Sequence, residues 1–162
     1  MRKNNTHDYA VSALFMYAKE NYPKSEMFLE KLREAEGEYL EFARENKKAS
    51  KLKFRKMFEK VAEIRSIYLD VLAIEQALYI NDDERSKLIL ECVKRVYFEA
   101  GKYGTKKGLI DSLCVRASMD LHISVSSVYI YLAEALRRFC LSRGLRLDAP
   151  RAKSIKTLKR KQ

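Results

Sequence analysis

Several residue types are scarce in this chain of 162 residues, and each scarcity excludes a class of structure. Only 5 glycines and 2 prolines are present, too few for the many turns of a β-sandwich or β-barrel. The 3 cysteines lack CxxC spacing and there are 2 histidines, so we expect neither a disulfide framework nor a metal site. No apolar run reaches the roughly 20 residues of a transmembrane helix, and residues 1–5 lack the apolar stretch of a secretory signal. These absences predict a cytoplasmic protein.

Charge, by contrast, is abundant and unevenly placed. The chain has 33 basic and 22 acidic residues, a formal net charge of +11. Residues 1–142 are nearly balanced, with 25 basic against 21 acidic residues, whereas residues 143–162 hold 8 against 1. Such a tail suits a polyanion, most often nucleic acid, because its binding releases counterions. The alternative is a tail that only aids solubility.

Apolar residues recur at helical spacing through the N-terminal half, which predicts helices over 8–21, 24–46 and 51–80. The second and third helices each carry a heptad-like seam, comprising Phe28, Leu32, Ala35, Tyr39 and Phe42, and then Phe54, Met57, Val61, Ile64, Tyr68, Val71 and Leu78. Two such helices with a short joint predict an antiparallel hairpin. The seam fits an oligomerisation surface and intramolecular packing equally well, because both require the same spacing.

The C-terminal half predicts three further helices. Asn81 is the expected N-cap of the first, with Glu84 closing a capping box, and Gly101 is its expected end. The others span 109–121 and 125–142. The fold class is therefore all-α, with a helical hairpin or coiled-coil-like bundle over 1–80, a helix-turn-helix domain over 81–144 and a basic tail over 145–162. The cysteines fall at apolar helix positions and are expected to be buried.

The segment between the last two helices has the residue order of a helix-turn-helix. A small residue, a leucine, an isoleucine, a serine cap and a valine follow one another as Ser118, Leu121, Ile123, Ser124 and Val128. The small side chain lets two helices cross closely, and the apolar residues hold the crossing angle. The serine caps the second helix and leaves its first turn facing outward, as in helices that enter the DNA major groove.

These residues resemble the helix-turn-helix of region 4 of bacterial sigma factors and of phage late transcriptional regulators of the ArpU type. The preceding stretch is similar too, through Asp83-Glu84-Arg85, Ile89-Leu90 and Tyr97-Phe98-Glu99-Ala100-Gly101, so that the resemblance covers about residues 81–139. His122 stands where this family usually has glycine, and the stretch from Gly101 to Ser118 is about ten residues longer. The resemblance implies a phage or prophage regulator acting on late genes, with RNA polymerase as a further partner.

The expected DNA-binding residues form two groups. The start of the last helix contributes Ser124, Val125, Ser126, Ser127, Tyr129 and Ile130. Basic residues are expected to bind phosphate, namely Lys106, Lys107, Arg116, Arg137, Arg138, Arg143, Arg146, Arg151, Lys153 and Lys156. None of the first group is Arg, Lys, Asn or Gln, the usual readers of base edges, so this helix alone predicts modest specificity.

The sequence thus predicts a transcriptional regulator that binds double-stranded DNA and self-associates through its N-terminal helices. We expect no catalysis and no cofactor, because the chain has no glycine-rich phosphate loop, no HExxH and no GxSxG. Two alternatives remain. One is a DNA-packaging protein of the small terminase type, and the other is a helical interaction module that targets RNA polymerase without binding DNA.

Overall fold

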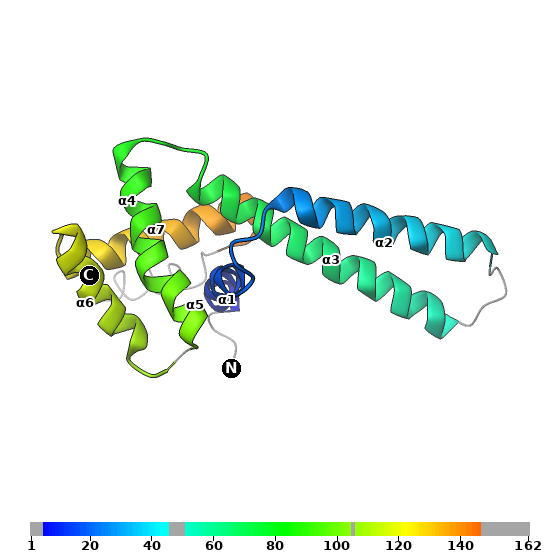
Figure 1. The fold of residues 1–162 in the computed structure, drawn as a ribbon, viewed down its shortest axis with the longest axis horizontal. Coiled ribbons are helices and arrows are strands. Elements are labelled where there is room, and N and C mark those ends of the chain that lie inside the picture. Colours follow the sequence, from blue (N-terminus) through cyan, green and yellow to red (C-terminus); the bar gives the residue numbers. More distant parts are fainter. Residues whose placement is uncertain (1–4, 46–50, 105, 147–162) are drawn as a thin grey trace, which may run out of the picture. The chain divides into compact units, whose positions relative to one another are not determined.

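A computed structural model describes residues 5–45, 51–104 and 106–146. Within these ranges the chain contains helices and no strand, which confirms the all-α class (Figure 1). The described residues form six helices when α4, η1 and α5, which follow one another without a break, are counted as one. No helix in the described part of the chain is both long and apolar enough to cross a membrane.

The chain forms two compact units whose boundaries differ from the expected division at residue 80. One unit spans residues 23–72, and the other combines residues up to 22 with those from 73 onward. The first helix, α1 (Asn5–Lys19), contacts α5, η1 and α7, and so belongs with the C-terminal helices. Its apolar residues Ala10, Leu14 and Ala18 are buried.

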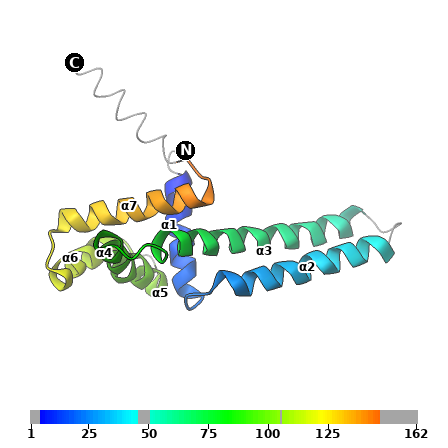
Figure 2. The same cartoon turned by 90° about the horizontal axis from the view of Figure 1, so that it is seen from above.

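The unit of residues 23–72 is the predicted hairpin of α2 (Ser25–Glu45) and the greater part of α3 (Lys51–Leu78). The two helices lie side by side (Figures 1 and 2). Buried side chains of Leu32, Ala35 and Val61 form a small core, and partly buried Tyr39, Ile64 and Tyr68 pack against it. These residues of the predicted seam therefore make an intramolecular contact within the hairpin.

The other unit is built around one continuous helix made of α4 (Glu84–Val93), η1 (Lys94–Phe98) and α5 (Glu99–Tyr103). Its side chains are buried on several sides, since Ile89, Val93, Val96, Phe98 and Ala100 are fully inaccessible. A π-helical turn such as η1 is wider than an α-helical one and shifts the register of the residues that follow. We call α4, η1 and α5 together the central helix.

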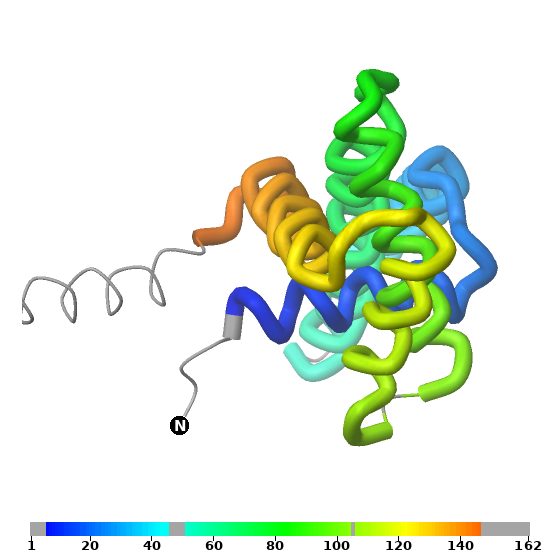
Figure 3. The backbone as a smooth tube through the Cα atoms, turned by 90° about the vertical axis from the view of Figure 1, so that its left-hand side faces the viewer, coloured from blue at the N-terminus to red at the C-terminus, as the bar shows by residue number. Residues whose placement is uncertain are grey.

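Three helices surround the central helix. They are α1, α6 (Leu109–Leu121) and α7 (Val125–Arg143), and each contacts part of it (Figure 3). The inner face of α7 is buried, at Val128, Leu132, Ala135, Leu136 and Phe139. The three cysteines, Cys92, Cys114 and Cys140, are also buried, as predicted. Burial raises the pKa of the Cys92 thiol to about 11, so this thiol stays protonated and unreactive at neutral pH.

An aromatic cluster fixes α1 to its neighbours. The ring of Tyr17 lies 5.4 Å from that of Phe98 and 5.7 Å from that of Tyr22, measured between centroids. Tyr79, just after the end of α3, lies 6.5 Å from Tyr17. Tilted and edge-to-face ring pairs at these separations add to the stabilisation from burial. The cluster therefore joins α1, the central helix and the segment after α3.

The prediction that Asn81 caps the central helix is wrong by two residues. Asp83 caps this helix instead, because its carboxylate accepts from the Ser86 backbone N–H at 3.1 Å and from the Ser86 hydroxyl at 2.6 Å. Asn81 and Asp83 both suit a cap by composition. The hydrogen bonds from Ser86 identify Asp83 as the cap. The same hydrogen bonds lower the pKa of the Asp83 carboxyl.

The prediction that Gly101 ends the central helix is also wrong. The helix continues to Tyr103, and Gly104 takes the positive φ of 84°. Gly101 instead allows α1 to approach closely, because a Cβ at this position would lie 2.6 Å from the Phe15 carbonyl oxygen. A side chain of any size would therefore push the two backbones apart.

Replacing Gly101 with alanine should lower the free energy of unfolding by about 1–3 kcal/mol, the usual effect of overpacking a tight contact. Gly37 is the matched control, since it lies in α2 and a Cβ added there would meet no neighbouring atom within 4 Å. Gly37→Ala should stabilise the protein by about 0.5–1 kcal/mol through helix propensity. Urea unfolding followed by circular dichroism measures both. Equal effects of the two substitutions would contradict the close-approach role of Gly101.

Candidate nucleic-acid interface

The turn between α6 and α7 is closed by hydrogen bonds to Ser118. The backbone N–H groups of His122 and Ile123 donate to the Ser118 carbonyl, and the Ser118 hydroxyl donates to the Ile123 carbonyl at 2.6 Å. His122 ends α6 with a left-handed backbone at φ 56°. The small residue expected at position 118 thus also ties the turn together, and His122 adopts the conformation that glycine favours.

Ser124 is the N-cap of α7, as predicted. Its hydroxyl oxygen accepts from the Ser127 backbone N–H at 3.0 Å, and the two serine hydroxyls lie 2.8 Å apart. Several side chains of the first two turns remain open to solvent, with Val125 at 36%, Ser126 exposed, Tyr129 at 41% and Ile130 at 58%. The capped start of α7 therefore presents a surface without charged side chains.

Tyr129 is exposed on one side and bound to α6 on the other. Its hydroxyl donates a hydrogen bond to the Asp111 carboxylate in the first turn of α6. This hydrogen bond raises the pKa of the Tyr129 phenol well above its ordinary value, so the proton stays on Tyr129. Tyr129 therefore helps to fix α7 on α6 while part of its ring remains accessible.

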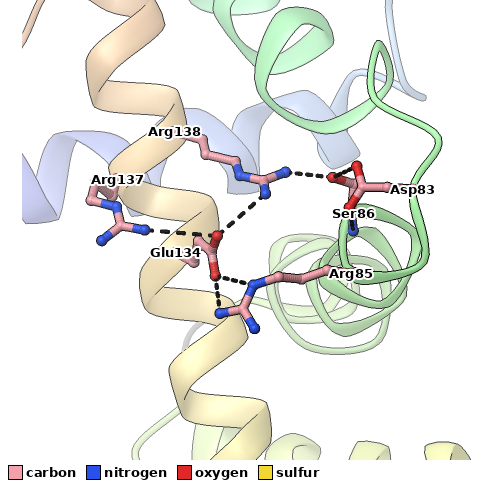
Figure 4. Close-up of polar contacts among 6 residues, drawn as sticks. All are labelled: Asp83, Arg85, Ser86, Glu134, Arg137 and Arg138. Carbon is pink, nitrogen blue, oxygen red and sulfur yellow. Dashed lines mark hydrogen bonds and ion pairs between the residues drawn. The ribbon is translucent and has the colours of Figure 1, made fainter.

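The carboxylate of Glu134 on α7 pairs with three arginines, one from α4 and two from α7 itself (Figure 4). Arg85 of α4 donates to it from Nε at 2.9 Å and from Nη2 at 2.5 Å. Arg138 and Arg137 pair with the other Glu134 oxygen at 3.2 Å and 3.7 Å. The Glu134 side chain is only 12% exposed, and the hydrogen bonds from Arg85 foremost hold the pKa of its carboxyl below the ordinary range.

Arg138 extends this cluster to the cap of the central helix. Its Nη1 donates to the Ser86 hydroxyl at 2.8 Å, and Ser86 in turn donates to Asp83. The Arg85 guanidinium also lies 5.1 Å from the centre of the Tyr131 ring. The cluster of Asp83, Arg85, Ser86, Glu134 and Arg138 thus fixes α7 on α4. The sequence does not identify Arg85 and Ser86 as partners of α7, because they lie about fifty positions away in the chain.

The other basic residues predicted to bind DNA are placed differently. Lys106 and Lys107 are exposed immediately before α6, and Arg116 is exposed on α6 itself. Arg137 is about half exposed, with one weak pairing to Glu134. Beyond α7, Arg146 is exposed, and Arg143, the last residue of the helix, is half-buried. The remaining predicted residues, Arg151, Lys153 and Lys156, lie outside the described residues.

The two lysines lie far from the start of α7 along the chain. With a rise of about 1.5 Å per residue, the 13 residues of α6 separate Lys106 and Lys107 from the α6–α7 turn by about 20 Å along the helix axis. That distance exceeds the reach of a side chain. A ligand that contacts both regions must therefore be extended, as a nucleic-acid backbone is.

A groove between the central helix and α6 has no counterpart among the sequence predictions. Its volume is about 740 Å³, and its walls carry both charges, from Lys94, Arg95, Arg116, Glu91, Glu99 and Asp120. An ion pair of 3.3 Å between Arg95 and Asp120 crosses it. The buried Arg95 Nε has no hydrogen-bond partner among the described residues. Opposite charges line this groove in similar number, so it does not favour an anion.

The Glu134 cluster makes stability depend on pH. A carboxyl group whose pKa is lower in the folded than in the unfolded state stabilises the fold above its unfolded pKa, and this contribution is lost as the pH falls. For Glu134 the loss should begin below its ordinary value of 4.5. Glu134→Gln should lower the free energy of unfolding at pH 7 by about 1–3 kcal/mol, because Arg138 and Arg85 lose their anion.

Urea unfolding of the wild-type protein and of Glu134→Gln between pH 7 and pH 3 tests this expectation. The difference between the two proteins should shrink as the pH falls. The control is Glu63→Gln, at an exposed position on α3, which should leave the free energy of unfolding unchanged at both pH 7 and pH 3. A difference between the wild type and Glu134→Gln that stays constant down to pH 3 would contradict the account.

Comparisons of this chain with models of protein families, with curated proteins and with solved structures found no match.

Proposed function

We propose that the protein is a DNA-binding transcriptional regulator in which α6 and α7 act as a helix-turn-helix and α7 enters the major groove. The observation that carries this proposal is the start of α7. It is capped by Ser124, joined to α6 by a closed turn and open to solvent at Ser126, Tyr129 and Ile130. A recognition helix reads bases with the same N-terminal part.

The chemistry of this surface fits a limited form of base readout. Val125 and Ile130 can contact the thymine methyl group, and the Ser126 hydroxyl can donate to or accept from a base edge. No side chain in the first two turns of α7 can make the bidentate contact that arginine makes with guanine. The proposal therefore assigns modest sequence discrimination to α7 and most of the affinity to phosphate contacts.

The phosphate contacts are assigned to basic residues whose exposure lets them reach a DNA backbone. These are the exposed Lys106, Lys107, Arg116, Arg137 and Arg146, together with the basic residues of the C-terminal tail. Arg138 receives another role here, since its guanidinium already binds Glu134 and Ser86. It holds α7 in place and is not counted among the phosphate ligands.

Deleting residues 149–162 removes 6 basic residues and should weaken DNA binding. The slope of log K against log salt should become shallower by up to about 5, since each phosphate contact contributes about 0.9. Fluorescence anisotropy at several salt concentrations measures both quantities. The double substitution Lys106→Ala/Lys107→Ala should lower the slope by up to about 2. The double substitution Lys51→Ala/Lys56→Ala, in the hairpin, should leave it unchanged.

The expected differences between these variants separate DNA binding at the proposed surface from general attraction of a basic protein. If the substitutions of the hairpin lysines lower the salt slope as much as those of Lys106 and Lys107, then DNA does not bind at α6 and α7. If the full chain fails to bind any duplex at low salt, the protein is instead an interaction module. Either result would overturn the proposal.

A further inference from the structure

The hairpin of α2 and α3 carries a second apolar stripe beside the seam that forms its core. On α2 this stripe consists of Leu29, Leu40 and Ala43. Glu36 lies on the same face, so that positions 29, 36, 40 and 43 follow one another at intervals of 7, 4 and 3 residues. Leu40 is 57% exposed, and Leu29 and Ala43 are half-buried. A single helical face thus continues past the residues that contact α3.

The matching stripe on α3 consists of Phe58, Ala62, Leu69 and Leu72. Arg65 lies on the same face, so that positions 58, 62, 65, 69 and 72 follow one another at intervals of 4, 3, 4 and 3 residues. Phe58 is 57% exposed, Ala62 is exposed, and the two leucines are half-buried. Exposing more than half of a phenylalanine side chain to water is unfavourable unless another surface covers it.

An ion pair places the two stripes on the same side of the hairpin. Arg65 and Glu36 each occupy the charged position of their stripe, and the Arg65 Nη2 and Glu36 Oε1 atoms lie 2.9 Å apart. Another ion pair of the hairpin, Lys60–Glu38 at 3.8 Å, joins residues that belong to neither stripe. The second stripes of α2 and α3 therefore lie on one face of the hairpin, which is apolar except for the Glu36–Arg65 ion pair and which we call the open face.

Two adjacent seams on each helix are the pattern of a four-helix bundle. A helix in a two-helix contact needs one narrow seam, whereas a helix in a bundle contacts two neighbours and needs a stripe about three-sevenths of its surface wide. Within the described part of the hairpin, the core is small and consists of Leu32, Ala35 and Val61. The sequence thus provides for one more layer of helices than the hairpin itself supplies.

The charges of the two hairpin helices indicate that the additional helices come from a second copy of the chain. The helix α2 has 7 acidic and 3 basic residues, whereas residues 51–65 of α3 have 6 basic and 2 acidic residues. In a square of four helices formed by two copies, each acidic α2 can lie next to the basic α3 of its own chain and that of the other copy. The hairpin is therefore complementary to itself.

We propose that two copies of this chain associate through the open faces of their hairpins and form a four-helix bundle. The interface is isologous, and Leu40 and Phe58 of each copy become buried in it. This association deepens the homo-oligomer expected from the sequence, and it does not depend on DNA binding. The protein in solution is then a dimer that carries two copies of α7.

The mass of the full chain in solution tests this proposal in the absence of DNA. Light scattering coupled to gel filtration should give twice the 19.0 kDa of one chain. Leu40→Glu should weaken the dimer on the order of a hundredfold, because symmetry places two buried carboxylates in one apolar interface. Glu and Leu have similar helix propensity, so the hairpin itself should remain folded.

Leu52→Glu is the matched control, since Leu52 is 59% exposed on α3 and belongs to neither stripe. This variant should remain a dimer, and circular dichroism should show equal helix content in all three proteins. A monomeric wild-type protein would overturn the proposal, as would a ring of many subunits. Retention of the dimer in Leu40→Glu, or its equal loss in Leu52→Glu, would also overturn it.

Discussion

The close approach of α1 to the central helix at Gly101 is the contact on which the C-terminal unit depends. With no side chain at Gly101, the backbone of Phe15 can lie against it, and the aromatic cluster around Tyr17 can form. The central helix contacts all three surrounding helices, so a shift of α1 would be transmitted to α7 as well. The arrangement of the candidate interface therefore follows from an apolar core that lies behind it.

Polar contacts then set the orientation of α7 within that core. Glu134 and Arg85 join α7 to α4, Tyr129 joins it to Asp111 of α6, and Ser118 closes the turn between α6 and α7. Because these groups bind one another, they leave the charged side of α7 facing the protein. At its start, α7 presents to solvent the uncharged surface around Ser126 and Ile130, whereas its exposed Arg137 lies about two turns farther along the helix.

Local signals in the sequence predict the helices and the α6–α7 turn, because caps, glycines and apolar spacing act over a few residues. Ser124 lies where it is expected, at the start of α7. Contacts between distant segments could not be predicted. The helical spacing of α1 does not reveal which helices it will meet, so the sequence alone groups α1 with the hairpin. Gly101 suits the end of a helix and a tight crossing equally well, and only the position of Phe15 distinguishes them.

Selection of binding sites from a random duplex pool by the full-length protein tests most directly the proposal that α7 reads DNA. This proposal predicts an enriched motif with a short A·T-containing core, and loss of preference at that core in Ile130→Ala while overall affinity changes little. The proposed dimer further predicts two copies of the core in each selected site. Recovery of an unenriched pool, or the same motif with unchanged preference from Ile130→Ala, would contradict the account.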